Sequence, residues 1–142
     1  MGTVNAVEAA LPYLEQPDSG AIVAIDSISG VEDYGFGEVA YGAGMASLLF
    51  YMKLFANHLA PKGIPANVVS PGTIYCKGGV WYQTEQNDPL AFQKALAANP
   101  MRRMGTPEEI ANVVAFVARP RASFMAGANV VVDGAFKRRI QN

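Results

Sequence analysis

The chain has 142 residues, which is enough for one domain with a single hydrophobic core. About half of the residues are apolar (51%), only 16% are charged and the net charge is −1, so we expect no nucleic-acid-binding surface. The single cysteine, Cys76, excludes a disulfide within the chain. A lone thiol fits a reducing compartment, so we expect a cytoplasmic protein.

The sequence predicts neither a signal peptide nor a membrane span. Residues 1–5 lack the basic and apolar segments of a signal peptide. The most apolar stretch, residues 45–55, is interrupted by Lys53 and is shorter than the roughly 20 residues that span a bilayer. A small domain this apolar has surfaces that favour a partner, so we expect a homo-oligomer without membrane contact.

Hydrophobic periodicity predicts helices and strands in alternation. Helices are expected at residues 3–16, 41–59, 89–98 and 106–118, strands at 21–25, 64–69 and 129–132, and loops at 26–40 and 70–88. Strands that alternate with helices favour a parallel sheet. The predicted fold is therefore α/β, with about three strands and flanking helices.

Two of the helices carry further signals. Thr106-Pro107-Glu108-Glu109 has a capping hydroxyl, a proline at the first helical position and a glutamate three residues after the cap. The helix at residues 41–59 is apolar nearly all round, with Phe50 and Leu54 outside its main apolar face. Such a helix is buried on more than one side, here by a sheet and by another chain.

Three segments in a fixed order carry a family resemblance. They are Ile25-Asp26-Ser27-Ile28-Ser29-Gly30 followed by Tyr41, then Val69-Ser70-Pro71-Gly72-Thr73, then residues 103–111 together with residues 127–134. In this order and spacing they resemble the second half of short-chain dehydrogenase/reductases, over nearly the whole chain. The resemblance implies a partial Rossmann-like, doubly wound sheet. It also implies that residues 1–142 form a single truncated domain without the N-terminal dinucleotide-binding half.

The resemblance assigns catalytic roles to two residues, and it identifies a third position at which the family's lysine is absent. In the family a serine orients the substrate oxygen and a tyrosine transfers the proton, and these positions match Ser27 and Tyr41. A lysine four residues after the tyrosine holds the cofactor ribose and favours the phenolate of a group that normally titrates near 10. This sequence has Met45 there, which carries no charge and donates no hydrogen bond. Lys53 lies about three turns further along the helix, out of reach of Tyr41.

The cofactor positions are only partly matched. No G-x-G-x-x-G follows a first strand, so the phosphate-binding turn is missing. Pro71, Gly72 and Thr73 resemble the segment beside the nicotinamide, and Tyr75, Trp81 and Tyr82 fall where the family has its substrate-covering loop. We expect NAD or NADP to bind weakly or not at all, and we expect no metal site.

The sequence therefore predicts a degenerate or truncated dehydrogenase, a pseudoenzyme without normal hydride transfer. The first alternative is an active NAD(P)-dependent oxidoreductase acting on a carbonyl or alcohol, completed by another chain or by upstream sequence. The second is a small-ligand-binding module built on the aromatic loop around Trp81. No spacing rule makes Asp26 and Glu38 an acid-base pair. A free edge on the strand at residues 21–25 favours an oligomer through helices 3–16 and 41–59.

Overall fold

The computed structural model describes residues 2–15, 20–32 and 38–138. In chain order the elements are α1 (Gly2–Leu14), β1 (Ile22–Ile25), the 3₁₀ turn η1 (Ile28–Gly30), α2 (Val39–Leu59), β2 (Ala66–Pro71), α3 (Val80–Asn87), α4 (Pro89–Ala98), α5 (Pro107–Val117) and β3 (Asn129–Val132), with further 3₁₀ turns η3 (Ala60–Lys62) and η4 (Pro120–Ala122).

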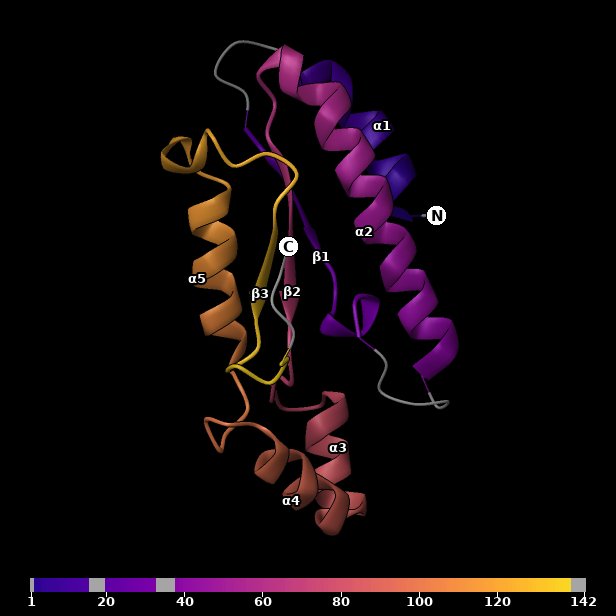
Figure 1. The fold of residues 1–142 in the computed structure, drawn as a ribbon, viewed down its shortest axis with the longest axis vertical. Coiled ribbons are helices and arrows are strands. Elements are labelled where there is room, and N and C mark those ends of the chain that lie inside the picture. The colour runs from indigo at the N-terminus through magenta and orange to yellow at the C-terminus, as the bar shows by residue number, and fades with distance from the viewer. Residues whose placement is uncertain (1, 16–19, 33–37, 139–142) are drawn as a thin grey trace.

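The three strands form one parallel sheet in the order β1-β2-β3, which confirms the predicted α/β class. Helices α1 and α2 lie on one face of this sheet and α5 covers the other (Figure 1). Helices α3 and α4 lie beyond the carboxyl ends of the strands (Figure 1). Because ligands of open α/β sheets bind at these ends, this arrangement places the candidate site next to α3.

The core has two parts because successive residues of β2 point to opposite faces. On one face Val68 packs in a cluster with Met52 and Leu59 of α2. On the other face Val69 packs with Ile110 and Val117 of α5. These two clusters fix the central strand, and so they fix the end of the strand at which the site opens.

Most predicted elements are present, with boundaries that differ by one or two residues and with one correction. Strand β2 begins at Ala66 rather than at residue 64, and α1 ends at Leu14 rather than at Gln16, which lies outside the described residues. The predicted loop at residues 70–88 contains α3, so that prediction was wrong. This helix has only eight residues and buries none of them fully, so it lacks the apolar stripe by which a helix is found in a sequence.

The capping box of α5 is confirmed. The Thr106 hydroxyl accepts a hydrogen bond from the Glu109 N–H, and the Glu109 carboxylate accepts one from the Thr106 N–H. Arg103 also forms an ion pair with Glu109. The Arg103 guanidinium and the Thr106 N–H lower the pKa of Glu109 to about 2.

Helix α2 is covered on one side only. Met52 is buried against the sheet, whereas Phe50 and Leu54 are 69% and 55% exposed. Together with the following turn, the segment Val39–Lys62 is long and apolar enough to cross a membrane, with a mean hydropathy of 1.3. The sequence-based expectation considered a shorter stretch, but a single such helix is weak evidence for a span. Within the described part of the chain, nothing supplies the predicted second cover for α2.

Candidate functional site

A pocket of about 560 Å³ opens at the carboxyl ends of β1 and β2. It is lined by residues from six parts of the fold, namely Ser27, Ile28, Ser29, Glu38, Tyr41, Gly72, Thr73, Val80, Trp81, Ala95 and Phe136. Segments far apart in the sequence meet here because the strands are parallel and their ends lie at one edge of the sheet. The lining combines several hydroxyl groups and one carboxylate with an apolar wall.

The pocket brings together five of the residues that the sequence singled out. Ser27 follows β1, Tyr41 lies in the first turn of α2, Gly72 and Thr73 follow β2, and Trp81 comes from α3.

The other residues singled out by sequence are not among the described residues that line it. Pro71 is the last residue of β2, and Tyr75 and Tyr82 contact each other edge to face, with ring centroids 6.3 Å apart. Met45 lies on α2 one turn after Tyr41.

Ser27 belongs to a short series of hydrogen bonds. Its hydroxyl oxygen accepts from the Ser29 N–H at 3.2 Å, and the Ser27 and Ser29 hydroxyls lie 3.3 Å apart. The Ser29 hydroxyl donates in turn to Glu38 Oε2 at 2.8 Å. Sequence reasoning missed both Ser29 and Glu38 as site residues. The two-residue spacing of the serines is typical of a hydroxyl turn and was a usable signal, whereas nothing local marked Glu38.

The position after Tyr41 where the family has lysine lies at a tight contact between α2 and η1. A Cβ atom added to Gly30 would lie 2.9 Å from the carbonyl carbon of Met45. Glycine at position 30 therefore permits the helix to approach the turn. Met45 supplies no cation at this place.

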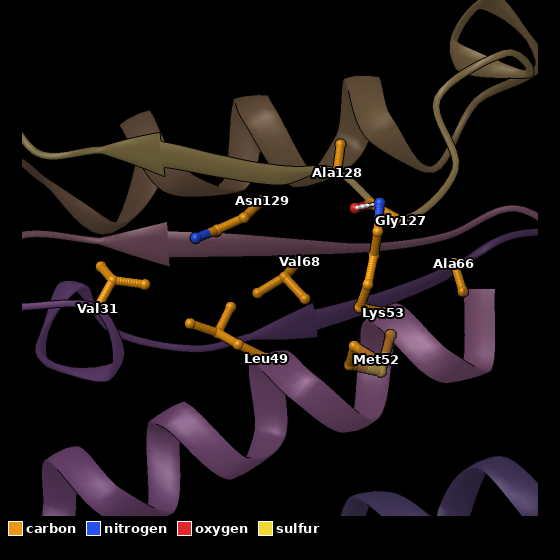
Figure 2. Close-up of a pocket in the computed structure, with 9 residues that line it drawn as sticks. All are labelled: Val31, Leu49, Met52, Lys53, Ala66, Val68, Gly127, Ala128 and Asn129. Carbon is orange, nitrogen blue, oxygen red and sulfur yellow. Dashed lines mark hydrogen bonds between the residues drawn. The ribbon is translucent and has the colours of Figure 1, made fainter. Parts of the chain in front are cut away.

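Lys53 does not take over the missing charge. Its ammonium donates to the Gly127 carbonyl at 3.0 Å, in a separate cavity of about 470 Å³ between α2 and the sheet (Figure 2). Leu49, Val68 and Asn129 also line this second cavity. Among the described residues, neither lysine nor arginine lines the pocket that contains Tyr41.

Known proteins are similar to this chain in sequence and in fold. A family model described as enoyl-(acyl carrier protein) reductase matches residues 1–137. The chain belongs to the short-chain dehydrogenase/reductase family. It is 42% identical over 134 residues to isoepoxydon dehydrogenase from Aspergillus clavatus, covering 94% of this chain and 52% of that protein. It is 33% identical to a 3-oxoacyl-[acyl-carrier-protein] reductase from Thermotoga maritima, with the same two coverages.

Solved structures agree with the sequence relatives. An NADPH-dependent reductase involved in bacilysin biosynthesis superposes with a TM-score of 0.86 and 26% identity, covering 96% of this chain and 54% of that one. An NADPH-bound short-chain oxidoreductase from Pseudomonas aeruginosa, described as containing an atypical catalytic center, has a TM-score of 0.85 and 28% identity, covering 96% and 53%. The chain thus spans about half the length of the dehydrogenases that it matches.

The residue before Ser27 is a buried acid. Asp26 is 6% exposed, and its backbone N–H continues the sheet by donating to the Val69 carbonyl at 2.9 Å. Its Oδ2 lies 3.4 Å from the Ser70 hydroxyl, while Oδ1 is buried without a partner among the described residues. Burial raises the pKa of Asp26 to about 6, against the opposing effect of hydrogen bonds from the Ser27 backbone and the Ser70 hydroxyl.

An aromatic cluster supports the wall of the pocket. The Tyr75 hydroxyl donates to Glu85 of α3, and its ring meets Phe92 of α4 edge to face with centroids 5.9 Å apart. The hydrogen bond to Glu85 is the main reason that the pKa of Tyr75 is raised to about 12. Tyr75 therefore joins the segment after β2 to α4 and to α3, the helix that carries Trp81.

Proposed function

We propose that this chain is the substrate-side half of a short-chain dehydrogenase in which hydride transfer is lost or strongly reduced. The observation that carries the proposal is Met45. The pocket retains the Ser27 and Tyr41 hydroxyls, but the position one turn after Tyr41 supplies no cation to favour a phenolate or to hold a ribose. Substrate binding needs only the pocket, whereas proton transfer at a useful rate needs that cation as well.

The residues on the nicotinamide side fit the end of a cofactor. The Thr73 hydroxyl is buried without a partner among the described residues and lines the pocket beside Gly72. An orphaned hydroxyl at this place can bond an amide such as the nicotinamide carboxamide. When bound, the cofactor would supply or accept the hydride, while Ser27 orients the substrate oxygen and Tyr41 exchanges its proton.

The phosphate side would have to come from outside residues 1–142. Strand β1 pairs only with β2 among the described strands, so its other edge is open. An apolar groove of about 530 Å³ runs between α1 and this strand, lined by Val7, Ala10 and Leu14 among others. These features, with the half-length match to dehydrogenases, support the second candidate: an NAD(P)-dependent oxidoreductase on a carbonyl or alcohol, completed by another chain or by upstream sequence.

The purified chain should show no saturable binding of NADH or NADPH up to about millimolar concentration, because the ribose and pyrophosphate contacts are missing. Nicotinamide fluorescence or calorimetry measures this directly. Saturable binding would contradict the truncated-site proposal. In that event Met45→Lys and Met45→Gln separate charge from polarity: a ribose contact that needs a cation is strengthened by lysine and not by glutamine.

We also propose that the chain forms a homo-oligomer through α1 and α2. The support is the uncovered apolar surface of these helices, where Tyr13 and Phe50 are 72% and 69% exposed. Size-exclusion chromatography with light scattering should give at least twice the mass of the chain at micromolar concentration. A stable monomer would refute this interface. A cytoplasmic location belongs to the same proposal, since Cys76 is an exposed free thiol.

A further inference from the structure

The hydrogen bonds among Ser27, Ser29 and Glu38 have a fixed direction. A glutamate carboxylate at neutral pH has no proton to donate, so it can only accept. Ser29 has one hydroxyl proton, and Ser29 uses it in the 2.8 Å hydrogen bond that it donates to Glu38 Oε2. Ser29 therefore has no hydroxyl proton left for Ser27, and the 3.3 Å contact between the two hydroxyls requires Ser27 to donate.

This direction leaves Ser27 without a donor for the pocket. Its single proton is directed at Ser29, and one of its lone pairs receives the Ser29 N–H at 3.2 Å. One lone pair remains for a ligand. Ser27 can thus accept a hydrogen bond from a ligand hydroxyl. To bond a carbonyl oxygen, it would first have to break its bond to Ser29.

We propose that Glu38 is a positioning residue that makes Ser27 a hydrogen-bond acceptor, so that the pocket selects an alcohol over the corresponding ketone. This rests on the proposed function, since it takes the pocket to be the substrate pocket. The Tyr41 and Thr73 hydroxyls also line it, and each can donate to an alcohol or to a ketone. The Glu38 carboxylate lines it too and can accept only from the alcohol, so the preference comes from Ser27 and from Glu38 itself.

The remaining lining defines the rest of the ligand. Ile28, Val80, Trp81 and Phe136 make one wall apolar, and the volume of about 560 Å³ accommodates a six-membered carbon ring. The ligand class is accordingly a secondary alcohol with an apolar ring or chain. Cyclohexanol and cyclohexanone form a matched pair of test ligands, because they differ only in whether the oxygen can donate.

Trp81 provides a readout specific to this pocket, because it is the one tryptophan in the sequence. Its indole N–H signal in a ¹H–¹⁵N NMR spectrum of the full chain is followed while cyclohexanol or cyclohexanone is added. Cyclohexanol should bind about three- to tenfold more tightly, which is the effect of one net hydrogen bond.

Two substitutions test the role of Glu38. In Glu38→Gln the side-chain amide can donate to Ser29, which frees Ser29 to donate to Ser27, so the preference for the alcohol should fall to about twofold or less, or reverse. Ser29→Ala removes the acceptor for the Ser27 proton but keeps the Glu38 carboxylate, so it isolates the part of the preference that comes from Ser27 and should also lower it. Glu38 makes no side-chain hydrogen bond to the end of α2, so its replacement costs no helix cap. Glu8→Gln on α1 makes the same charge change away from the pocket and should leave the preference unchanged.

The outcomes distinguish a failure of the role of Glu38 from a failure of the pocket as a substrate site. Equal affinity of the wild-type chain for both ligands would overturn the role of Glu38 and leave the pocket as a substrate site. A preference that is unchanged in Ser29→Ala would overturn it as well, because Glu38 would then act on the ligand directly and not through Ser27. If neither ligand shifts the Trp81 signal, the pocket itself is not a substrate site, and the proposed function fails together with the inference.

Discussion

Gly72→Ala should lower the free energy of unfolding by about 1–3 kcal/mol, the range for forcing an extra methyl group into a packed site. A Cβ atom at position 72 would lie 2.7 Å from Asp133 Cβ and 2.8 Å from its Cα. Backbone that close cannot move aside freely, since the Asp133 carbonyl accepts a hydrogen bond from Asn99 and the Gly72 N–H donates to Val132. Urea unfolding followed by circular dichroism measures the change.

Gly44→Ala is the matched control. Apart from the nearby backbone of α2 itself, no heavy atom of the described residues lies within 4 Å of the site of a Cβ at position 44. Alanine there should raise the free energy of unfolding by about 0.5–1 kcal/mol, because glycine is a poor helix former. Equal effects of the two substitutions would show that the close approach of the strand ends at Gly72 does not govern stability.

The parts of the fold that follow from local patterns could be predicted. The capping box at Thr106 and Glu109 marks the start of α5, and the apolar run before Asp26 marks β1. Helix α3 could not be found this way. Its residues are held by tertiary contacts, such as the hydrogen bond from Tyr75 to Glu85, and these leave no periodic pattern in the sequence.

The residues of the candidate site also divide into those that could be predicted from the sequence and those that could not. Ser27, Tyr41 and Gly72 could be predicted because each lies at the end of an element in a family motif, and the pocket contains all three. Glu38 could not, because its contact with Ser29 joins residues nine apart in the sequence and depends on where α2 begins. Phe136 could have been predicted from the sequence, because it follows the last strand of a parallel sheet, where site residues gather.

Asp26→Asn should raise the free energy of unfolding by about 1–2 kcal/mol more at pH 8 than at pH 4. The pKa of Asp26 is raised from 3.8 to about 6 in the folded protein. The folded state therefore holds its proton more strongly than the unfolded chain does, and protonation contributes stability that is fully present below pH 3.8 and is lost as the pH rises through 6. A raise of this size corresponds to at most about 3 kcal/mol, reduced here for partial solvent screening.

Asparagine removes this dependence because it does not titrate, and its side-chain carbonyl can accept from the Ser70 hydroxyl as Asp26 Oδ2 does. Urea unfolding of both proteins at pH 4, 6 and 8 gives the difference between them, in which the opposite contribution of Glu109, whose pKa is lowered, cancels. Asp88→Asn serves as the control, since Asp88 is exposed and asparagine caps α4 equally well. A difference between Asp26→Asn and the wild type that stays constant with pH would mean that the Asp26 carboxylate is solvated in the folded protein. The neutral acid would then have no part in holding the end of β1, from which Ser27 enters the pocket.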